Sequence, residues 1–96
     1  MLFMVEMDII VPHDIDKNSF EILKTKEKAR AQELQSNGTW QHLWRVAGRY
    51  ANVSVFNVSD AGALHDLMMS LPLYPFMHVK VTTLCKHPSA IADDKK

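Results

Sequence analysis

The first segment of the chain, residues 2–11, alternates apolar and polar side chains. The apolar positions are Phe3, Val5, Met7, Ile9 and Val11, and carboxylates stand between them at Glu6 and Asp8. A period of two is typical of a strand with one buried face. Pro12 follows directly and is expected to end the strand, because proline has no backbone N–H to donate.

A helix is predicted over residues 19–36, where Lys, Glu, Ala, Leu and Gln dominate. Residues 14–18 supply capping residue types before it, and Asn37-Gly38 is a typical C-terminal signal after it. A second helix is expected to begin after Ser59 or Asp60 and to end at Pro72. Its apolar residues have the i, i+3, i+4, i+7 spacing, at Leu64, Leu67, Met68 and Leu71.

Two strands, Thr39–Val46 and Ala51–Val58, are predicted to form a hairpin with its turn at Gly48. A fourth strand is expected over residues 76–84. There Met77, Val79 and Val81 alternate with His78, Lys80 and Thr82. From Lys86 onward the pattern predicts an irregular segment.

The resulting order is β-α-β-β-α-β, an α+β, ferredoxin-like arrangement with both helices on one face of an antiparallel sheet. We expect one domain over residues 1–96, with an irregular tail over about 87–96. The other face of the sheet is also partly apolar, through Leu2, Met4 and Ile10 and through Phe56 and Val58 beside Val53 and Val55. Two such sheets packed face to face would bury it as a dimeric α+β barrel.

Composition restricts the function classes. The 11 Lys and Arg balance 11 Asp and Glu, which argues against nucleic acid or an anionic membrane as the partner. No apolar stretch approaches the ~18–20 residues of a membrane span, and the N-terminus lacks the features of a signal peptide. Cys85 is the single cysteine, which excludes an intrachain disulfide and favours a reducing, cytoplasmic location.

Glu27 lies on the apolar side of the first predicted helix. Its neighbours on that side are Phe20, Leu23, Ala31 and Leu34. Burial disfavours the charged form of a carboxyl and raises its pKa, which suits a general base or acid near neutral pH. The alternative is a carboxylate at the helix edge that pairs with Arg30 or Lys24 and only solvates the surface.

The densest cluster of polar and aromatic residues is in the predicted hairpin, over residues 40–45 and 49–52. In a regular strand Trp40, His42 and Trp44 share one face, and Gln41, Leu43 and Arg45 share the other. Either face could line a pocket. In the alternative interpretation, the two tryptophans fill the core or an interface and His42 has a structural role.

Other chemistry has weaker support. The remaining histidines, His13, His65, His78 and His87, have no metal-ligand spacing, so no metal site is expected. The three glycines are isolated and form no phosphate-binding loop. Cys85 has no catalytic partner close by in the sequence.

The hairpin sequence Gly38–Gly48, together with Tyr50-Ala51-Asn52, closely resembles the muconolactone isomerase family. Three other stretches are similar to it as well: Met1–Val5, Leu64–Leu73 and Lys86–Ser89. The similarity therefore extends from Met1 to about Ile91. Val53 and the order Tyr74-Pro75-Phe76 depart from the family pattern, and both changes move a phenol. They leave open how well chlorinated or methylated lactones would be tolerated.

The resemblance implies conversion of muconolactone to 3-oxoadipate enol-lactone in the catechol branch of the β-ketoadipate pathway. It also implies a ferredoxin-like subunit, dimers joined into a homodecamer, and neither a metal nor an organic cofactor. In this reaction Glu27 would take the C4 proton and return it at C2 as a single base. Tyr50, His42 and Asn52 are candidate donors to the lactone oxygen. Arg45 is the first candidate to clamp the carboxymethyl group, with Arg49 or Lys24 behind it.

Two other classes of function fit the predicted fold. The same architecture could host a lactone dehalogenase or a cofactor-free monooxygenase, because one fold supports several chemistries. It could also be a non-catalytic small-ligand module in which Glu27 and Arg45 merely pair. Halide release, dioxygen consumption, or ligand binding without turnover would distinguish these possibilities.

Overall fold

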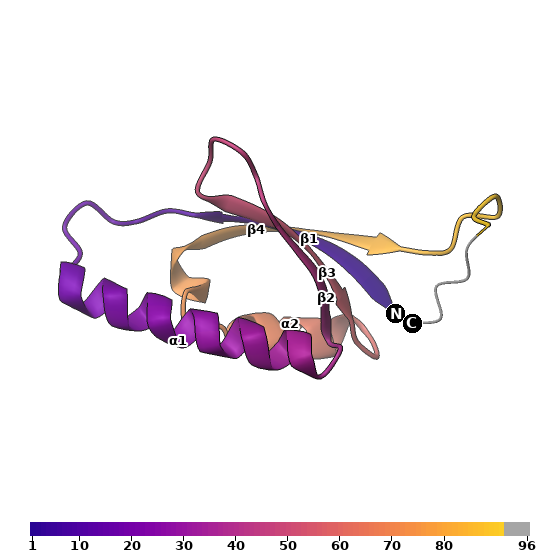
Figure 1. Cartoon of the computed structure of the whole chain (residues 1–96), viewed down its shortest axis with the longest axis horizontal. Coiled ribbons are helices and arrows are strands. Elements are labelled where there is room, and N and C mark those ends of the chain that lie inside the picture. Colours follow the sequence, from indigo (N-terminus) through magenta and orange to yellow (C-terminus); the bar gives the residue numbers. More distant parts are fainter. Residues whose placement is uncertain (92–96) are drawn as a thin grey trace.

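The computed structural model describes residues 1–91, in which one antiparallel sheet is covered on one face by two helices (Figure 1). The elements are β1 Leu2–Ile9, α1 Lys17–Ser36, β2 Trp40–Arg45, β3 Ala51–Asn57, α2 Ala61–Met69, a 3-10 helix Tyr74–Phe76 and β4 Met77–Leu84. The strands are ordered β2-β3-β1-β4 in the sheet. This is the ferredoxin-like arrangement, so the predicted fold class is confirmed.

The core lies between the sheet and the two helices. β1 is central, pairing with β3 on one side and β4 on the other, and its alternate residues point at the helices. The buried residues that form the core cluster are Phe3, Val5, Met7, Ala31, Leu34, Trp40, Phe56, Leu64, Met68 and Leu71. They come from both helices, from three of the strands and, at Leu71, from the segment after α2, so the sheet and the helices are held together by one apolar layer.

Helix α1 begins two residues earlier than the sequence predicted. Asp16 is its N-cap, and the Asp16 carboxylate accepts hydrogen bonds from the backbone N–H and the hydroxyl of Ser19, at 2.9 and 2.8 Å. These bonds lower the pKa of Asp16 below its usual value, and the bond from the backbone N–H has the larger effect. Asn37 caps the other end as expected, and Gly38 then adopts a positive φ of 86° that suits glycine.

Helix α2 begins at the Asp60 cap, whose carboxylate accepts a hydrogen bond from the N–H of Ala63 at 2.8 Å. It ends at Met69, before the predicted end at Pro72, and Ser70 is its C-cap, with the Ser70 N–H bonded to the Asp66 and Leu67 carbonyls. A 3-10 helix follows that the sequence did not predict. Neither described helix has the length and apolar character needed to cross a membrane.

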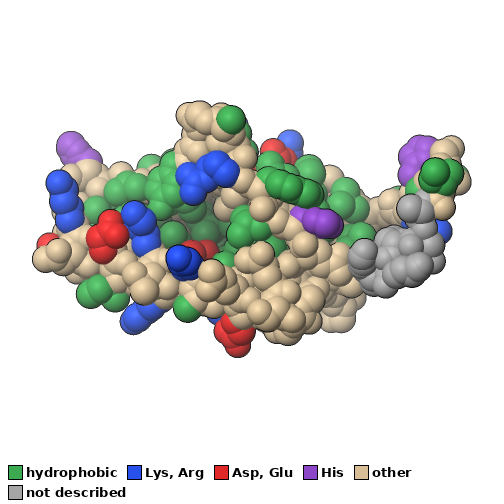
Figure 2. All heavy atoms as spheres, viewed as in Figure 1, with side chains coloured by type: hydrophobic (Ala, Val, Ile, Leu, Met, Phe, Trp, Pro, Cys, Tyr) green, Lys and Arg blue, Asp and Glu red, His purple; other side chains and the backbone are tan. Residues whose placement is uncertain are grey.

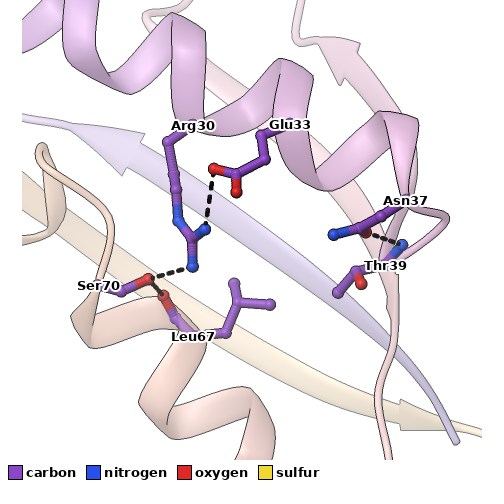
Figure 3. Close-up of polar contacts among 6 residues, drawn as sticks. All are labelled: Arg30, Glu33, Asn37, Thr39, Leu67 and Ser70. Atoms are coloured by element: carbon purple, nitrogen blue, oxygen red, sulfur yellow. Dashed lines mark hydrogen bonds and ion pairs between the residues drawn. The ribbon is translucent and has the colours of Figure 1, made fainter.

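The guanidinium of Arg30 connects the two helices. One of its nitrogens donates to Glu33 in the same helix and the other donates to the Ser70 hydroxyl at the end of α2, both at 3.1 Å (Figure 3). The Ser70 hydroxyl in turn donates to the Leu67 carbonyl at 2.6 Å. The chain that leaves α2 is thereby tied to the middle of α1.

The second face of the sheet is not covered by the helices. Residues on it include Leu2, Met4, Val53 and Val55, all partly exposed, and Trp44, which is 55 % exposed. The placement of Phe56 and Val58 on this face was wrong: Phe56 pairs with Phe3 on the helix side and is 0 % exposed, and Val58 packs against the core cluster. Beyond β4, the chain to Ile91 has no regular structure and extends away from the body (Figure 1). The rest of the predicted tail lies outside the described residues.

Candidate active site

A cavity of about 570 Å³ lies between α1 and the β2–β3 hairpin. Figure 2 shows it as a hollow with apolar side chains inside and basic side chains around its rim. Its lining combines apolar residues of the sheet with polar residues of the helix and the hairpin. They are Ile9, Glu21, Lys24, Thr25, Glu27, Lys28, Ala31, Gln32, Gln35, Trp40, Leu43, Arg45, Tyr50, Ala51, Asn52, Leu73 and Met77.

Glu27 faces this cavity from the middle of α1, as its place on the apolar side of the helix predicted. Its Oε1 accepts a hydrogen bond of 2.9 Å from the backbone N–H of Leu73. Burial raises the pKa of Glu27 above its usual value, and the Leu73 N–H opposes that rise in part. The carboxylate is therefore fixed at one oxygen and is a stronger base than an exposed glutamate.

The two cations proposed as surface partners of Glu27 are used elsewhere. Arg30 pairs with Glu33 and bonds to Ser70, while Lys24 pairs with Glu21 at 3.2 Å. No salt bridge within residues 1–91 involves Glu27. The interpretation of Glu27 as a paired surface carboxylate is therefore wrong, and its partial burial is balanced by a single peptide N–H.

A β-bulge at Gln41 changes which residues of β2 face the cavity. Trp40 pairs with Phe56 and His42 with the next residue, Val55, so two steps on β2 match one step on β3. After the bulge, Leu43 and Arg45 are on the helix side together with Trp40, and all three line the cavity. The predicted sharing of one face by Trp40, His42 and Trp44 is wrong for this reason.

His42 and Trp44 lie on the opposite face of the sheet. Their rings are stacked, with centroids 4.9 Å apart and planes inclined by 5°. Both are exposed, and neither lines the cavity. His42 was a candidate donor to the lactone oxygen, and within one chain the structure does not bring it to Glu27.

Arg45, Tyr50 and Asn52 meet at one wall of the cavity. Arg45 and Asn52 are directly paired across β2 and β3, which places their side chains next to each other on the helix side. The guanidinium carbon of Arg45 lies 5.6 Å from the centroid of the Tyr50 ring, within the range of a cation–π interaction. The hairpin therefore presents a cation, a phenol and an amide together.

The two alternative cations differ in position. Lys24 lines the cavity from α1. It is paired with Glu21, and its side chain is 43 % exposed. Arg49 does not line the cavity, because its guanidinium bonds to Asp8 Oδ1 at 2.6 Å. Of the three candidates for an anion clamp, Arg45 and Lys24 line the cavity and Arg49 does not, and Lys24 is already paired with Glu21.

Sequence reasoning missed several residues that form the cavity. Leu73 contributes through its backbone, which no side-chain pattern can indicate. Trp40 was not missed, since its strand face was named as a possible pocket wall; it lines the cavity although it is only 2 % exposed, and its indole N–H is a buried donor without a hydrogen-bond partner in the described chain. Lys28 and Gln32 follow Lys24 at i+4 and i+8 on α1, a helical relation to a candidate residue that could have suggested them.

Within residues 1–91 there is no group of three or more His, Cys, Asp or Glu side chains that could hold a metal ion. The groups that line the cavity include a partly desolvated carboxylate, hydrogen-bond donors and cations. Such a set can move a proton on a small anionic molecule.

Comparison with known proteins gives a consistent result along the whole chain. The family model for muconolactone delta-isomerase matches residues 1–90. Muconolactone Delta-isomerase 2 of Acinetobacter lwoffii is 52 % identical over 96 residues, and muconolactone Delta-isomerase of Pseudomonas putida is 51 % identical over 96, each covering 100 % of both chains. A crystal structure of muconolactone isomerase superposes with a TM-score of 0.93 at 52 % identity, again over 100 % of both chains.

Proposed function

The chain belongs to the muconolactone Δ-isomerase family, and we propose that its cavity isomerises muconolactone to 3-oxoadipate enol-lactone in catechol breakdown through the β-ketoadipate pathway. The observation that carries the proposal is Glu27, a partly buried carboxylate with a raised pKa that faces the cavity without an ion-pair partner. On this proposal the reaction uses only side chains of the protein.

The chemistry requires a base and a place for negative charge. The ring double bond of muconolactone is conjugated to the lactone carbonyl, so loss of the C4 proton gives a dienolate. Protonation of that dienolate at C2 leaves the double bond between C3 and C4. Atoms balance without a co-reactant, because the proton removed at one carbon is replaced at another.

Glu27 is suited to both proton transfers. Its Oε1 is held by the Leu73 N–H, so the second oxygen is the one available to the substrate. A carboxylate positioned between C4 and C2 can remove a proton from one face of the ring and return it on the same face. Desolvation makes the group basic enough to take the proton, and protonation then removes the cost of a buried charge.

The charge that grows on the lactone oxygen needs hydrogen-bond donors placed in advance. Tyr50 and Asn52 both line the cavity, and they are the donors that we propose. His42 is not included, because it is on the other face of the sheet. Loss of one such donor typically reduces the rate by about 10²–10³-fold.

Arg45 is proposed to bind the carboxymethyl group of the substrate. A planar guanidinium can hold a carboxylate through two parallel hydrogen bonds, and contact with the Tyr50 ring orients it. Lys24 on the facing helix adds positive charge to the same cavity. Fixing the non-reacting end of the lactone would direct C4 toward Glu27, which is a contribution of proximity.

The test is to incubate the protein with muconolactone in deuterated water and to follow both lactones by NMR. We expect loss of substrate, appearance of the enol-lactone, and deuterium at C2 in proportion to exchange of the Glu27 proton with solvent. Saturable binding without turnover would contradict the proposal and favour a non-catalytic module. Halide release from a chlorinated lactone, or dioxygen consumption, in place of isomerisation would favour another enzyme on this fold.

We also propose that two chains pack through the uncovered face of the sheet as the smallest stable unit. The exposed Trp44 and the partly exposed Met4, Val53 and Val55 on that face support this, because an apolar patch of this kind is unusual on a monomer. The homodecamer remains an expectation from the family resemblance. Sedimentation at low micromolar concentration that found a fully active monomer would refute the dimer.

A cytoplasmic location is our further proposal, and it rests on cysteine chemistry. Cys85 is exposed and unpaired, and no second cysteine is present. An exposed free thiol is best preserved in a reducing compartment. Cell fractionation that recovered the native protein from an oxidising compartment would contradict this location.

A further inference from the structure

Ser54 is the only polar residue of the described chain that is fully enclosed, with 0 % of its surface exposed. It lies on β3, facing the helices, between Val5 on β1 and Leu43 on β2. Both cross-strand neighbours are apolar. The single hydrogen bond of its hydroxyl within residues 1–91 is donated to Oδ1 of Asn52 at 2.8 Å.

The apolar surroundings determine the direction of this hydrogen bond. A serine hydroxyl has one hydrogen to donate, and leaving it unbonded in a buried site is costly. Donation to the Asn52 carbonyl oxygen satisfies it. With the amide reversed, the NH₂ group would donate to Ser54, and the hydroxyl hydrogen would have no acceptor among its apolar neighbours. Ser54 therefore favours the orientation that leaves both Asn52 N–H groups free.

Asn52 is in a suitable position to use those donors. It lines the cavity, and its cross-strand neighbours are Arg45 on one side and Met7 on the other. A substrate whose carboxymethyl group is bound by Arg45 would place its lactone ring within reach of the adjacent amide. If the Asn52 amide presents its N–H groups to the lactone ring, it would stabilise negative charge there. If it presents its carbonyl oxygen, it would repel that charge.

We propose that Ser54 is a positioning residue for the isomerisation, which fixes Asn52 as a hydrogen-bond donor toward the lactone oxygen that gains charge in the dienolate. Ser54 does not touch the substrate in this proposal and acts only through Asn52. The inference rests on the proposed function, because it assigns the direction of the Asn52 amide within that reaction.

The test is a double-mutant cycle with Ser54→Ala, Asn52→Ala and the double variant, assayed for kcat and KM on muconolactone. Ser54→Ala removes one atom, so the fold should be retained, and circular dichroism checks this. We expect Ser54→Ala to lower kcat about tenfold with KM within twofold of the parent. Asn52→Ala should lower kcat by about a hundredfold, within the usual effect of one donor. In the Asn52→Ala background, Ser54→Ala should change kcat less than twofold.

A matched control is Thr83→Ala, which deletes an exposed hydroxyl from the same sheet away from the cavity and should leave kcat unchanged. The proposal fails if the kcat of Ser54→Ala stays within twofold of the parent. It also fails if the loss of kcat in the double variant equals the product of the losses in the two single variants. An inactive parent protein would instead refute the proposed function, so the two failures are distinguishable.

Discussion

Replacing Glu27 by Gln should have opposite effects on activity and stability. The amide has nearly the same size as the carboxylate and can still accept the Leu73 N–H bond, but it cannot take a proton. General acid–base catalysis contributes about 10²–10⁴-fold, so we expect kcat to fall by at least about a hundredfold. A hundredfold corresponds to about 2.7 kcal/mol of barrier.

The stability of the same variant should increase at neutral pH. Burial raises the pKa of Glu27 in the folded state above its ordinary value of 4.5, so the folded protein holds this proton more tightly than the unfolded chain. The carboxyl therefore opposes folding once the pH rises above the folded-state pKa, where it carries a desolvated charge. Glutamine carries no charge and avoids this cost. Below the unfolded pKa the carboxyl is neutral in both states, and the difference between the two proteins should disappear.

The structure gives the sign of the stability change, and each kcal/mol moves the Tm of a domain of this size by roughly 4–8 °C. Because part of the carboxylate still faces the cavity, solvent screening reduces the effect, so we expect a Tm at neutral pH that is higher than the parent's by a small amount on this scale.

Thermal melts at fixed protein concentration, at neutral pH and below about pH 4.5, measure this together with the pH dependence of kcat/KM in the parent. The parent's kcat/KM should fall as pH drops through a pKa above 4.5. A variant that turns over within threefold of the parent would remove Glu27 from the mechanism. If Glu27→Gln lowered the Tm equally at both pH values, the buried charge of Glu27 would not destabilise the parent protein as we infer.

Arg45→Ala should raise KM on muconolactone at least tenfold with a smaller change in kcat, because a clamp on the non-reacting carboxylate acts in the ground and transition states alike. Its matched control, Arg49→Ala, should leave KM within twofold, and the reverse pattern would place the clamp at Arg49. Asp60→Ala should destabilise the fold by about 0.5–2 kcal/mol in a denaturant titration, through loss of the α2 cap, with kcat/KM unchanged in the folded protein. Trp44→Glu should shift sedimentation toward a monomer, whereas Ile22→Glu, at a comparably exposed residue of α1, should not; dissociation by both or by neither would refute the proposed sheet interface.

The order of the elements could be predicted from the sequence because it depends on local periodicity. The period of two in β1 and the capping residues around both helices are local signals, and they gave the ferredoxin-like order correctly. The 3-10 helix Tyr74–Phe76 was missed, since it depends on where the chain must go after α2 and not on a repeating pattern. Its path is fixed by long-range contacts such as Arg30 to Ser70.

The candidate site was predictable only in part. Glu27 could be found because a carboxylate among apolar positions of a helix is visible in the sequence, and Arg45, Tyr50 and Asn52 could be found because the hairpin concentrates polar residues. The hydrogen bond from Leu73 to Glu27 joins residues that are 46 positions apart and uses a backbone group, so no local pattern reports it. A role for Ser54 could not be predicted, because a serine in a strand has no distinguishing feature in the sequence until its burial is known.

The assignment of faces in the hairpin depends on one extra residue. Trp40 packs against Phe56 in the core, and Arg45 must be on the same side to stand beside Asn52. These two residues are five positions apart, an odd number, so a regular strand would place them on opposite faces. The bulge at Gln41 absorbs one position and brings both to the helix side.

The same bulge sends His42 and Trp44 to the uncovered face. A single extra residue in β2 therefore determines both which hairpin side chains can meet a substrate and which are left for the proposed contact with a second chain. Alternation counted from Trp40 fails beyond Gln41 for this reason, while the pairing of Arg45 with Asn52 shows that the strand regains its regular ladder directly after the bulge. The separation of the proposed catalytic side from the proposed assembly side in this hairpin is thus a consequence of register.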